Sequence, residues 1–150
     1  PVVQGGKVLI APPDAPVLHC LSLRDGRLLW KEDRAADDLY LAGAFGGRVL
    51  LVGKQACRAL SLADGKLLWR VDTGQPSGHG AAAGGIYYLP VRHDAEAKGP
   101  AVLAIDLEKG KVASRVAVAG KEPPGNLLFH EGRVVSQTLD AVTVFPQAKK

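Results

Sequence analysis

One phrase occurs twice in this chain in the same register, and it constrains the fold more than any other feature. CLSLRDGRLLW runs from Cys20 to Trp30, and ALSLADGKLLW runs from Ala59 to Trp69. The second tryptophan follows the first by 39 residues. A fixed period near forty is typical of modular arrays, in which each unit is one supersecondary element that cannot bury its apolar faces alone. The repeat therefore predicts architecture, and it says little about activity.

Two weaker signals extend the repeat to four units. The phrase AIDLEKGKVAS, from Ala104 to Ser114, carries serine where the tryptophan stood. A glycine turn that leads into an apolar run precedes each phrase and occurs a fourth time. These four segments are Gly5–Leu9, Gly46–Leu50, Gly84–Tyr88 and Glu131–Val135. We therefore expect four units, of which the last is truncated.

Each full unit is predicted to be a four-stranded antiparallel meander. The connections are short and carry glycine, which supplies the positive φ of tight hairpin turns. Val49–Val52 is apolar on both sides of its strand, so both faces of that sheet require cover. The expected strands of the second unit are Tyr40–Phe45, Arg48–Val52, Cys57–Leu62 and Lys66–Val71. Stacked blades of this kind indicate an all-β propeller segment, and a solenoid is the structural alternative.

The predicted domain is a partial propeller over residues 1–150. Its blades span about 1–34, 39–72, 79–119 and 125–146, the last without its outer strand, and a basic tail occupies 147–150. An open row of four blades would leave apolar faces and a strand edge uncovered. We therefore expect partners in the form of other blades, as in a segment of a seven- or eight-bladed propeller or a half that dimerises.

The charge distribution favours neither nucleic acid nor membrane. The formal net charge is +4, but basic and acidic side chains alternate along the strands, which is typical of a mixed solvated surface. A basic end occurs at Lys149 and Lys150, with no aromatic ladder for base stacking. No segment approaches the roughly 18 uncharged apolar residues of a membrane span. We expect no nucleic-acid partner and no membrane span.

The repeated phrase resembles the tryptophan-docking repeat of the quinoprotein-like propellers, whose pattern is close to Ala-x-Asp-x-x-Thr-Gly-Lys-x-x-Trp. The matching residues are Gly26, Arg27 and Trp30, then Ala59, Gly65, Lys66 and Trp69, then Ala104, Asp106, Gly110 and Lys111. The resemblance implies that Trp30 and Trp69 lie on outer strands and pack against the adjoining blade. The chain departs from the pattern at the aspartate, which is Ser22 or Ser61, and at the threonine, which is Asp25, Asp64 or Lys109.

The resemblance implies the chemistry of that family, which is oxidation of alcohols or sugars by pyrroloquinoline quinone held with calcium. Members with that activity share a pair of adjacent bridged cysteines, whereas this chain has Cys20 and Cys57, 37 residues apart. We expect no cofactor in this segment, and the quinone with calcium is possible only with blades outside it. A disulfide between the two cysteines stays open, although free cysteine usually behaves as a small buried apolar residue.

No catalytic constellation is evident. The four histidines fall in different units without metal-ligand spacing. His93 and Asp94 come nearest to an acid–base pair, but adjacent residues on a strand point to opposite faces.

A meander places its glycine turns at one rim and its longer, irregular connections at the other, where recognition usually occurs. The expected irregular connections are Pro12–Pro16, Arg34–Asp38, Lys54–Ala56, Gln75–His79, Arg92–Pro100 and Lys121–Gly125. The candidate binding residues on this rim are Arg34, Asp38, Gln75, His79, Arg92, His93, Asp94 and Lys121. The alternative is that these connections are merely exposed linkers.

Three functions are compatible with the sequence. The first is a non-catalytic scaffold that binds a partner protein through the irregular rim, similar to the propellers that assist outer-membrane barrel assembly. The second is part of a quinone-dependent alcohol or sugar dehydrogenase, and the third is a ligand-sensing domain of a larger protein. A periplasmic or cell-envelope location is implied by the resemblance.

Overall fold

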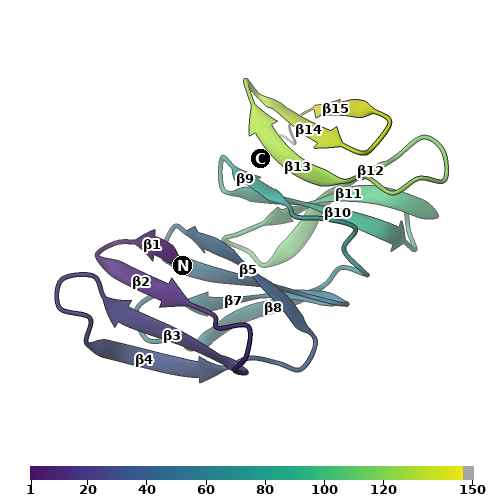
Figure 1. Cartoon of the computed structure of the whole chain (residues 1–150). Helices are drawn as coiled ribbons and strands as arrows, with labels where there is room; N and C mark the ends of the chain where they lie inside the picture. The colour runs from purple at the N-terminus through teal and green to yellow at the C-terminus, as the bar shows by residue number, and fades with distance from the viewer. Residues whose placement is uncertain (147–150) are drawn as a thin grey trace. The chain divides into compact units, whose positions relative to one another are not determined.

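The computed structural model describes residues 1–146, and the expected basic tail at 147–150 lies outside the described residues. Regular secondary structure in the described part of the chain is entirely β-strand (Figure 1). The strands form four antiparallel sheets with four, four, four and three members. The predicted all-β fold is therefore confirmed, and the sheets are those of a partial β-propeller of about four blades with a short last blade.

Each sheet is a simple meander in chain order. The first contains β1 (Val2–Gln4), β2 (Lys7–Ile10), β3 (Val17–Ser22) and β4 (Leu28–Asp33). The second contains β5 (Asp38–Phe45), β6 (Arg48–Gly53), β7 (Ala56–Ser61) and β8 (Leu67–Asp72). The third contains β9 (Ala81–Ala83), β10 (Ile86–Asp94), β11 (Gly99–Asp106) and β12 (Lys111–Ala117). The fourth contains β13 (Asn126–His130), β14 (Arg133–Gln137) and β15 (Val142–Pro146).

The sequence predicts a long irregular connection over Arg92–Pro100, and this prediction is wrong. Strands β10 and β11 continue further, with Asp94 opposite Gly99, and they leave a turn of residues 95–98. The register shifts between Val91 and Asp94, which marks a bulge. The irregular composition of this segment therefore reflects a bulged hairpin end and not a loop.

The chain divides into two compact units. Unit 1 comprises residues 1–53 and 57–70, and unit 2 comprises residues 54–56 and the chain from Val71 onward. Unit 1 thus holds the first sheet and most of the second, and unit 2 holds the third and fourth sheets.

Unit 1 is held by one apolar cluster between its two sheets. Leu9, Leu18 and Cys20 from the first sheet meet Val49 and Leu51 from the second. All four residues of Val49–Val52 are fully buried, as their apolar character predicts for a strand covered on both faces. Burial of such side chains contributes roughly 25 cal/mol per Å² of apolar surface, so this cluster stabilises the packing of the two sheets.

Unit 2 has an equivalent cluster between the third and fourth sheets. Ile86 and Tyr88 of β10 pack with Leu127, Val134 and other residues of the last sheet. The Tyr88 and Phe129 rings stack with their centroids 6.3 Å apart. The three-stranded last sheet is therefore anchored by its packing on the third sheet.

The sequence repeat corresponds to a repeat of backbone hydrogen bonds. In each of the first three sheets, an amide in the turn between strands three and four donates to the second glycine of the turn between strands one and two. These bonds are Leu23 N to Gly6 O, Leu62 N to Gly47 O and Leu107 N to Gly85 O, at 2.9, 2.9 and 3.0 Å. The two tight turns of a sheet are thus tied to each other, which explains why the glycines and the phrase recur in step.

Trp30 lies on the outermost strand of the first sheet and contacts the second sheet. Its indole Nε1 donates to the carbonyl oxygen of Leu62 at 3.1 Å, and its ring packs on the apolar cluster of unit 1. The ring also covers Gly65, because a Cβ atom added there would lie 2.8 Å from Trp30 Cε3. Trp30 thus contacts residues of the second sheet through both its ring and its indole nitrogen. Trp69 occupies the matching position on β8 and is half-buried.

Candidate functional site

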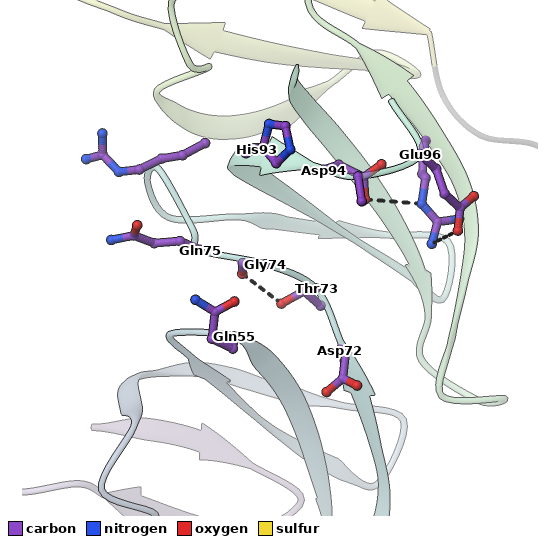
Figure 2. A pocket seen from close by; sticks show the side chains of 11 residues that line it. Gln55, Asp72, Thr73, Gly74, Gln75, His93, Asp94 and Glu96 are labelled. Carbon is purple, nitrogen blue, oxygen red and sulfur yellow. Dashed lines mark hydrogen bonds and ion pairs between the residues drawn. The ribbon is translucent and has the colours of Figure 1, made fainter. Parts of the chain in front are cut away.

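The structure brings four of the predicted rim residues together around one hollow of unit 2. This rim pocket has a volume of about 480 Å³ and opens to solvent. It is lined by Gln55, Asp72, Thr73, Gly74, Gln75, Arg92, His93, Asp94, Ala95, Glu96 and Arg115. Figure 2 shows that Gln55, Asp72 and the labelled residues of β10 converge on it from separate segments of the chain.

Four segments of the chain supply the walls of the rim pocket. Residues 92–96 form the end of β10 and the following turn, and Arg115 comes from β12. Residues 73–75 form the start of the connection from β8 to β9, and Gln55 comes from the short turn between β6 and β7. Because most of the lining lies on strand ends and short turns, the pocket is built on a rigid frame.

Backbone hydrogen bonds fix the connection that forms one wall. Thr73 N donates to Gln55 O, and Arg92 N donates to Gln75 O, both at 2.9 Å. Gly74 has a φ of +80°, and a Cβ atom there would lie 2.8 Å from the carbonyl oxygen of His93. Glycine is therefore required at this point, because it alone allows the connection to approach β10 so closely.

A charged network closes one side of the rim pocket. Asp94 Oδ2 accepts from Arg115 Nε at 3.2 Å, and Arg115 Nη2 pairs with Glu96 Oε1 at 3.0 Å (Figure 2). The other oxygen of Asp94 accepts from the amide of Ala97 at 2.7 Å. The side chain of Asp94 is 10% exposed and that of Glu96 is 71% exposed. Asp94 is thus the internal anchor of the network.

This arrangement limits what the rim pocket can do chemically. Both carboxylate oxygens of Asp94 accept hydrogen bonds from within the protein, which fixes the carboxylate in place. His93 is exposed on the strand and Asp94 is buried, so the adjacent pair faces different environments. Within residues 1–146, no cluster of three or more His, Cys, Asp or Glu side chains could hold a metal ion. The exposed polar groups suit hydrogen bonding to a bound chain.

The remaining predicted rim residues lie elsewhere. Arg34 and Asp38 belong to unit 1, where Arg34 Nη2 donates to Asp38 O. His79 lies in the connection from β8 to β9, and its amide donates to Asn126 Oδ1 at 2.8 Å. Lys121 is exposed in the connection from β12 to β13. None of these four lines the rim pocket.

Sequence reasoning missed several pocket residues, above all Arg115. Arg115 lies on β12, where the charge pattern of the sequence indicates solvent-exposed surface. Its partner Asp94 lies two strands away in the same sheet. A useful signal was present, because Asp94 and Glu96 crowd two acidic side chains at one hairpin end. Such a concentration of charge calls for a cation nearby.

The docking turns have their own electrostatics. The Ser61 hydroxyl and then the Lys66 amide donate to Asp64, and these bonds lower the pKa of that carboxyl. Ser22 and Arg27 lower the pKa of Asp25 in the same way. In the third turn, Asp106 Oδ1 accepts from the amides of Glu108 and Lys109 at 2.9 Å. In the first two turns, serine and aspartate stand where the quinoprotein pattern has aspartate and threonine, and the pair keeps a polar link across the turn. The third turn keeps the aspartate of the pattern as Asp106.

The two cysteines are buried thiols of unit 1 and no disulfide joins them. Burial raises the pKa of the Cys20 thiol, although the nearby Lys7 charge opposes this effect. Cys20 thus belongs to the apolar cluster. Within residues 1–146, no helix has the length and apolar character needed to span a bilayer.

The four-stranded meanders, the tied glycine turns and the docked indole together define a tryptophan-docking β-propeller of the quinoprotein-like class. The family described as outer membrane protein assembly factor BamB matches residues 1–79 and again 53–148. The chain belongs to this family of propellers built from pyrroloquinoline-quinone-type repeats. A comparison with curated proteins gives no match.

Solved structures share the fold at low sequence identity. BamB from Moraxella catarrhalis is 16% identical with a TM-score of 0.73, over 97% of this chain and 44% of that chain. The computationally designed protein Ika4 is 14% identical with a TM-score of 0.75, over 98% of this chain and 89% of its own. Quinohemoprotein alcohol dehydrogenase ADHIIG from Pseudomonas putida HK5 is 19% identical with a TM-score of 0.67, over 91% and 27%. This chain thus spans less than half the length of BamB.

Proposed function

We propose that this chain is a non-catalytic propeller scaffold of the bacterial cell envelope, and that it binds a partner protein through the rim pocket. The observation that carries this proposal is the match of nearly the whole chain to the family described as an outer membrane protein assembly factor. The name of this family refers to assembly and not to a reaction. Membership of the same family supports the proposed envelope location.

The chemistry of the rim pocket supports binding over catalysis. The pocket offers both hydrogen-bond donors and hydrogen-bond acceptors on exposed side chains. These side chains are Gln55, Gln75, Arg92 and His93. The buried Asp94 carboxylate, which could otherwise act as a base, accepts hydrogen bonds from Arg115 and the Ala97 amide. Mixed donors and acceptors on a fixed frame are suited to a polar stretch of polypeptide.

Site-specific photo-crosslinking tests the proposal directly. A photoreactive residue is placed at Gln75 or Arg92 in the rim pocket, and in matched controls at Arg24 or Lys66 in the glycine-turn rim. All four positions are exposed. After irradiation in a bacterial envelope fraction, we expect one defined protein adduct from the pocket positions and none from the controls. Equal adducts from both rims, or none from the pocket, would refute a rim-specific scaffold.

A second measurement separates the scaffold from the dehydrogenase alternative. Pyrroloquinoline quinone and calcium are added to the 150-residue chain, and thermal stability and dye-linked alcohol oxidation are followed. The scaffold proposal expects no stabilisation and no turnover. Clear stabilisation together with turnover would replace it by the enzymatic function.

A further inference from the structure

Unit 1 contains a second hollow that differs in character from the rim pocket. This Arg34 pocket also has a volume of about 480 Å³, within the range of small-molecule sites. Its walls come from β1, β5 and the connection after β2, and most of the side chains are apolar. They include Val2, Ala11, Pro13, Leu39 and Leu41, and Pro1 and Tyr40 also line the pocket. Arg34 supplies the one charged side chain that lines the pocket.

The guanidinium of Arg34 is weakly satisfied by the protein. Nη1 donates to Pro12 O at 3.4 Å and Nη2 donates to Asp38 O at 3.3 Å, both longer than a usual N–H···O bond. The buried Nε atom has no hydrogen-bond partner. A guanidinium carries five N–H donors, so most of its capacity is unused.

The nearest acidic side chain does not neutralise Arg34. Both oxygens of Asp38 accept from Arg58, with Nε to Oδ1 at 3.2 Å, and Oδ2 also accepts from the amide of Ala35 at 3.0 Å. Asp38 and Arg58 therefore form a closed, largely buried ion pair. In the described part of the chain, no carboxylate forms an ion pair with Arg34. Arg34 therefore lines a hollow of mixed polar and apolar surface, and two backbone carbonyl oxygens are its hydrogen-bond acceptors.

We propose that the Arg34 pocket binds a carboxylate carried by a small apolar group, with Arg34 as its ion-pair partner. Guanidinium matches carboxylate geometry with two parallel bonds, and such bonds are about twice as strong as neutral ones. The apolar walls bury the attached group. Two sources share this chemistry: the C-terminal residue of a peptide and a short fatty acid. The site lies in unit 1 and does not depend on the function proposed for the rim pocket.

A binding titration tests this assignment. Amide NMR spectra of the 150-residue chain are recorded with N-acetyl-leucine and with hexanoate, which represent the peptide and fatty-acid sources. Each is compared with its uncharged twin, N-acetyl-leucinamide or hexanamide. A charged hydrogen bond predicts that the carboxylate binds about 10- to 100-fold more tightly than the twin. Saturation by one carboxylate supports the site and identifies the source.

Two variants at exposed Leu39 localise the effect without touching the core. Leu39→Asp places an anion beside Arg34 and should weaken carboxylate binding at least about tenfold. Leu39→Asn has nearly the same size as Leu39→Asp without the charge, so it measures the loss of the apolar wall contact alone. It should bind the carboxylate more tightly than Leu39→Asp and keep the preference for the carboxylate over its uncharged twin. Arg34→Gln should abolish the preference for the carboxylate over its twin.

Three results would each overturn the proposal. They are equal affinity for the carboxylates and their amides, unchanged affinity in Leu39→Asp, and no saturable shift near residues 34–41 with either probe. The amide spectrum of each variant reports its folding in the same experiment, so a misfolded variant is recognised at once.

Discussion

The contact between Trp30 and Gly65 gives the sharpest test of the docking geometry. Gly65 has a φ of +78°, so alanine there pays about 1–2 kcal/mol for the left-handed backbone. The new Cβ would also lie 2.8 Å from Trp30 Cε3 and must push the indole away. Displacement weakens the 3.1 Å bond to Leu62 O, worth about 0.5–1.5 kcal/mol, and some packing. We expect Gly65→Ala to cost about 2–4 kcal/mol.

The chain supplies a matched control for this substitution. Gly26 occupies the same place in the preceding turn with a φ of +71°, but a Cβ atom there would meet nothing within 4 Å. Gly26→Ala should therefore cost the backbone term alone, about 1–2 kcal/mol. Trp30→Phe keeps most of the packing, loses the indole donor and should cost about 1 kcal/mol, because Lys7 Nζ still donates to Leu62 O.

Urea unfolding followed by far-UV circular dichroism measures these differences. In the Trp30→Ala background, itself destabilised by about 3 kcal/mol, the clash at Gly65 is gone. Gly65→Ala should then fall to the cost of Gly26→Ala, which gives a coupling energy of about 1–2 kcal/mol in the double-mutant cycle. The reasoning is refuted if the two glycine substitutions cost the same in wild type, or if the cycle is additive within about 0.5 kcal/mol.

Three further outcomes are expected. Asp94→Ala should lower the free energy of unfolding by about 1–3 kcal/mol, because it leaves the partly buried Arg115 guanidinium without its buried ion-pair partner. Glu96→Gln changes an exposed side chain and should cost less than about 0.5 kcal/mol. Similar urea midpoints for the two variants would contradict the anchoring role of Asp94. The depressed pKa of Asp64 contributes stability that is present above about pH 4, the unfolded value, and is lost as the pH falls toward the folded value. Thermal midpoints of Asp64→Asn should therefore decline less than wild type between about pH 5 and pH 3, and parallel curves would argue against it. Alkylation of fully buried Cys20 should track global unfolding in urea; rapid modification of the folded chain would show that its cluster is open.

The fold could be predicted because each repeat landmark has a local physical cause. The glycine turns need positive φ, and the bonds from Leu23, Leu62 and Leu107 join each glycine turn to the repeated phrase of its own sheet. The apolar run Val49–Val52 needed cover on both faces, and it is fully buried. These are constraints between residues close in one sheet, so they leave a readable pattern in the sequence.

The candidate site was less predictable because it depends on pairings across strands. The ion pair of Asp94 and Arg115 joins β10 to β12, and nothing in the local pattern of either strand distinguishes it from surface charge. The segment Arg92–Pro100 was predicted as a loop because its charged composition hides a bulged strand end. Arg34 was predicted as a rim residue. The sequence could not show that its Nε atom lacks a hydrogen-bond partner, because the Asp38 carboxylate nearby accepts from Arg58 instead.

The carbonyl group of Leu62 has a consequence for how unit 1 opens. It accepts from Trp30 Nε1 and from Lys7 Nζ, so two side chains of the first sheet converge on one peptide group of the second. Separating the sheets would strip both donors from that oxygen at once. Amide protons of β2, β3, β6 and β7 should therefore exchange with solvent through a shared opening event, with one common free energy, and not sheet by sheet.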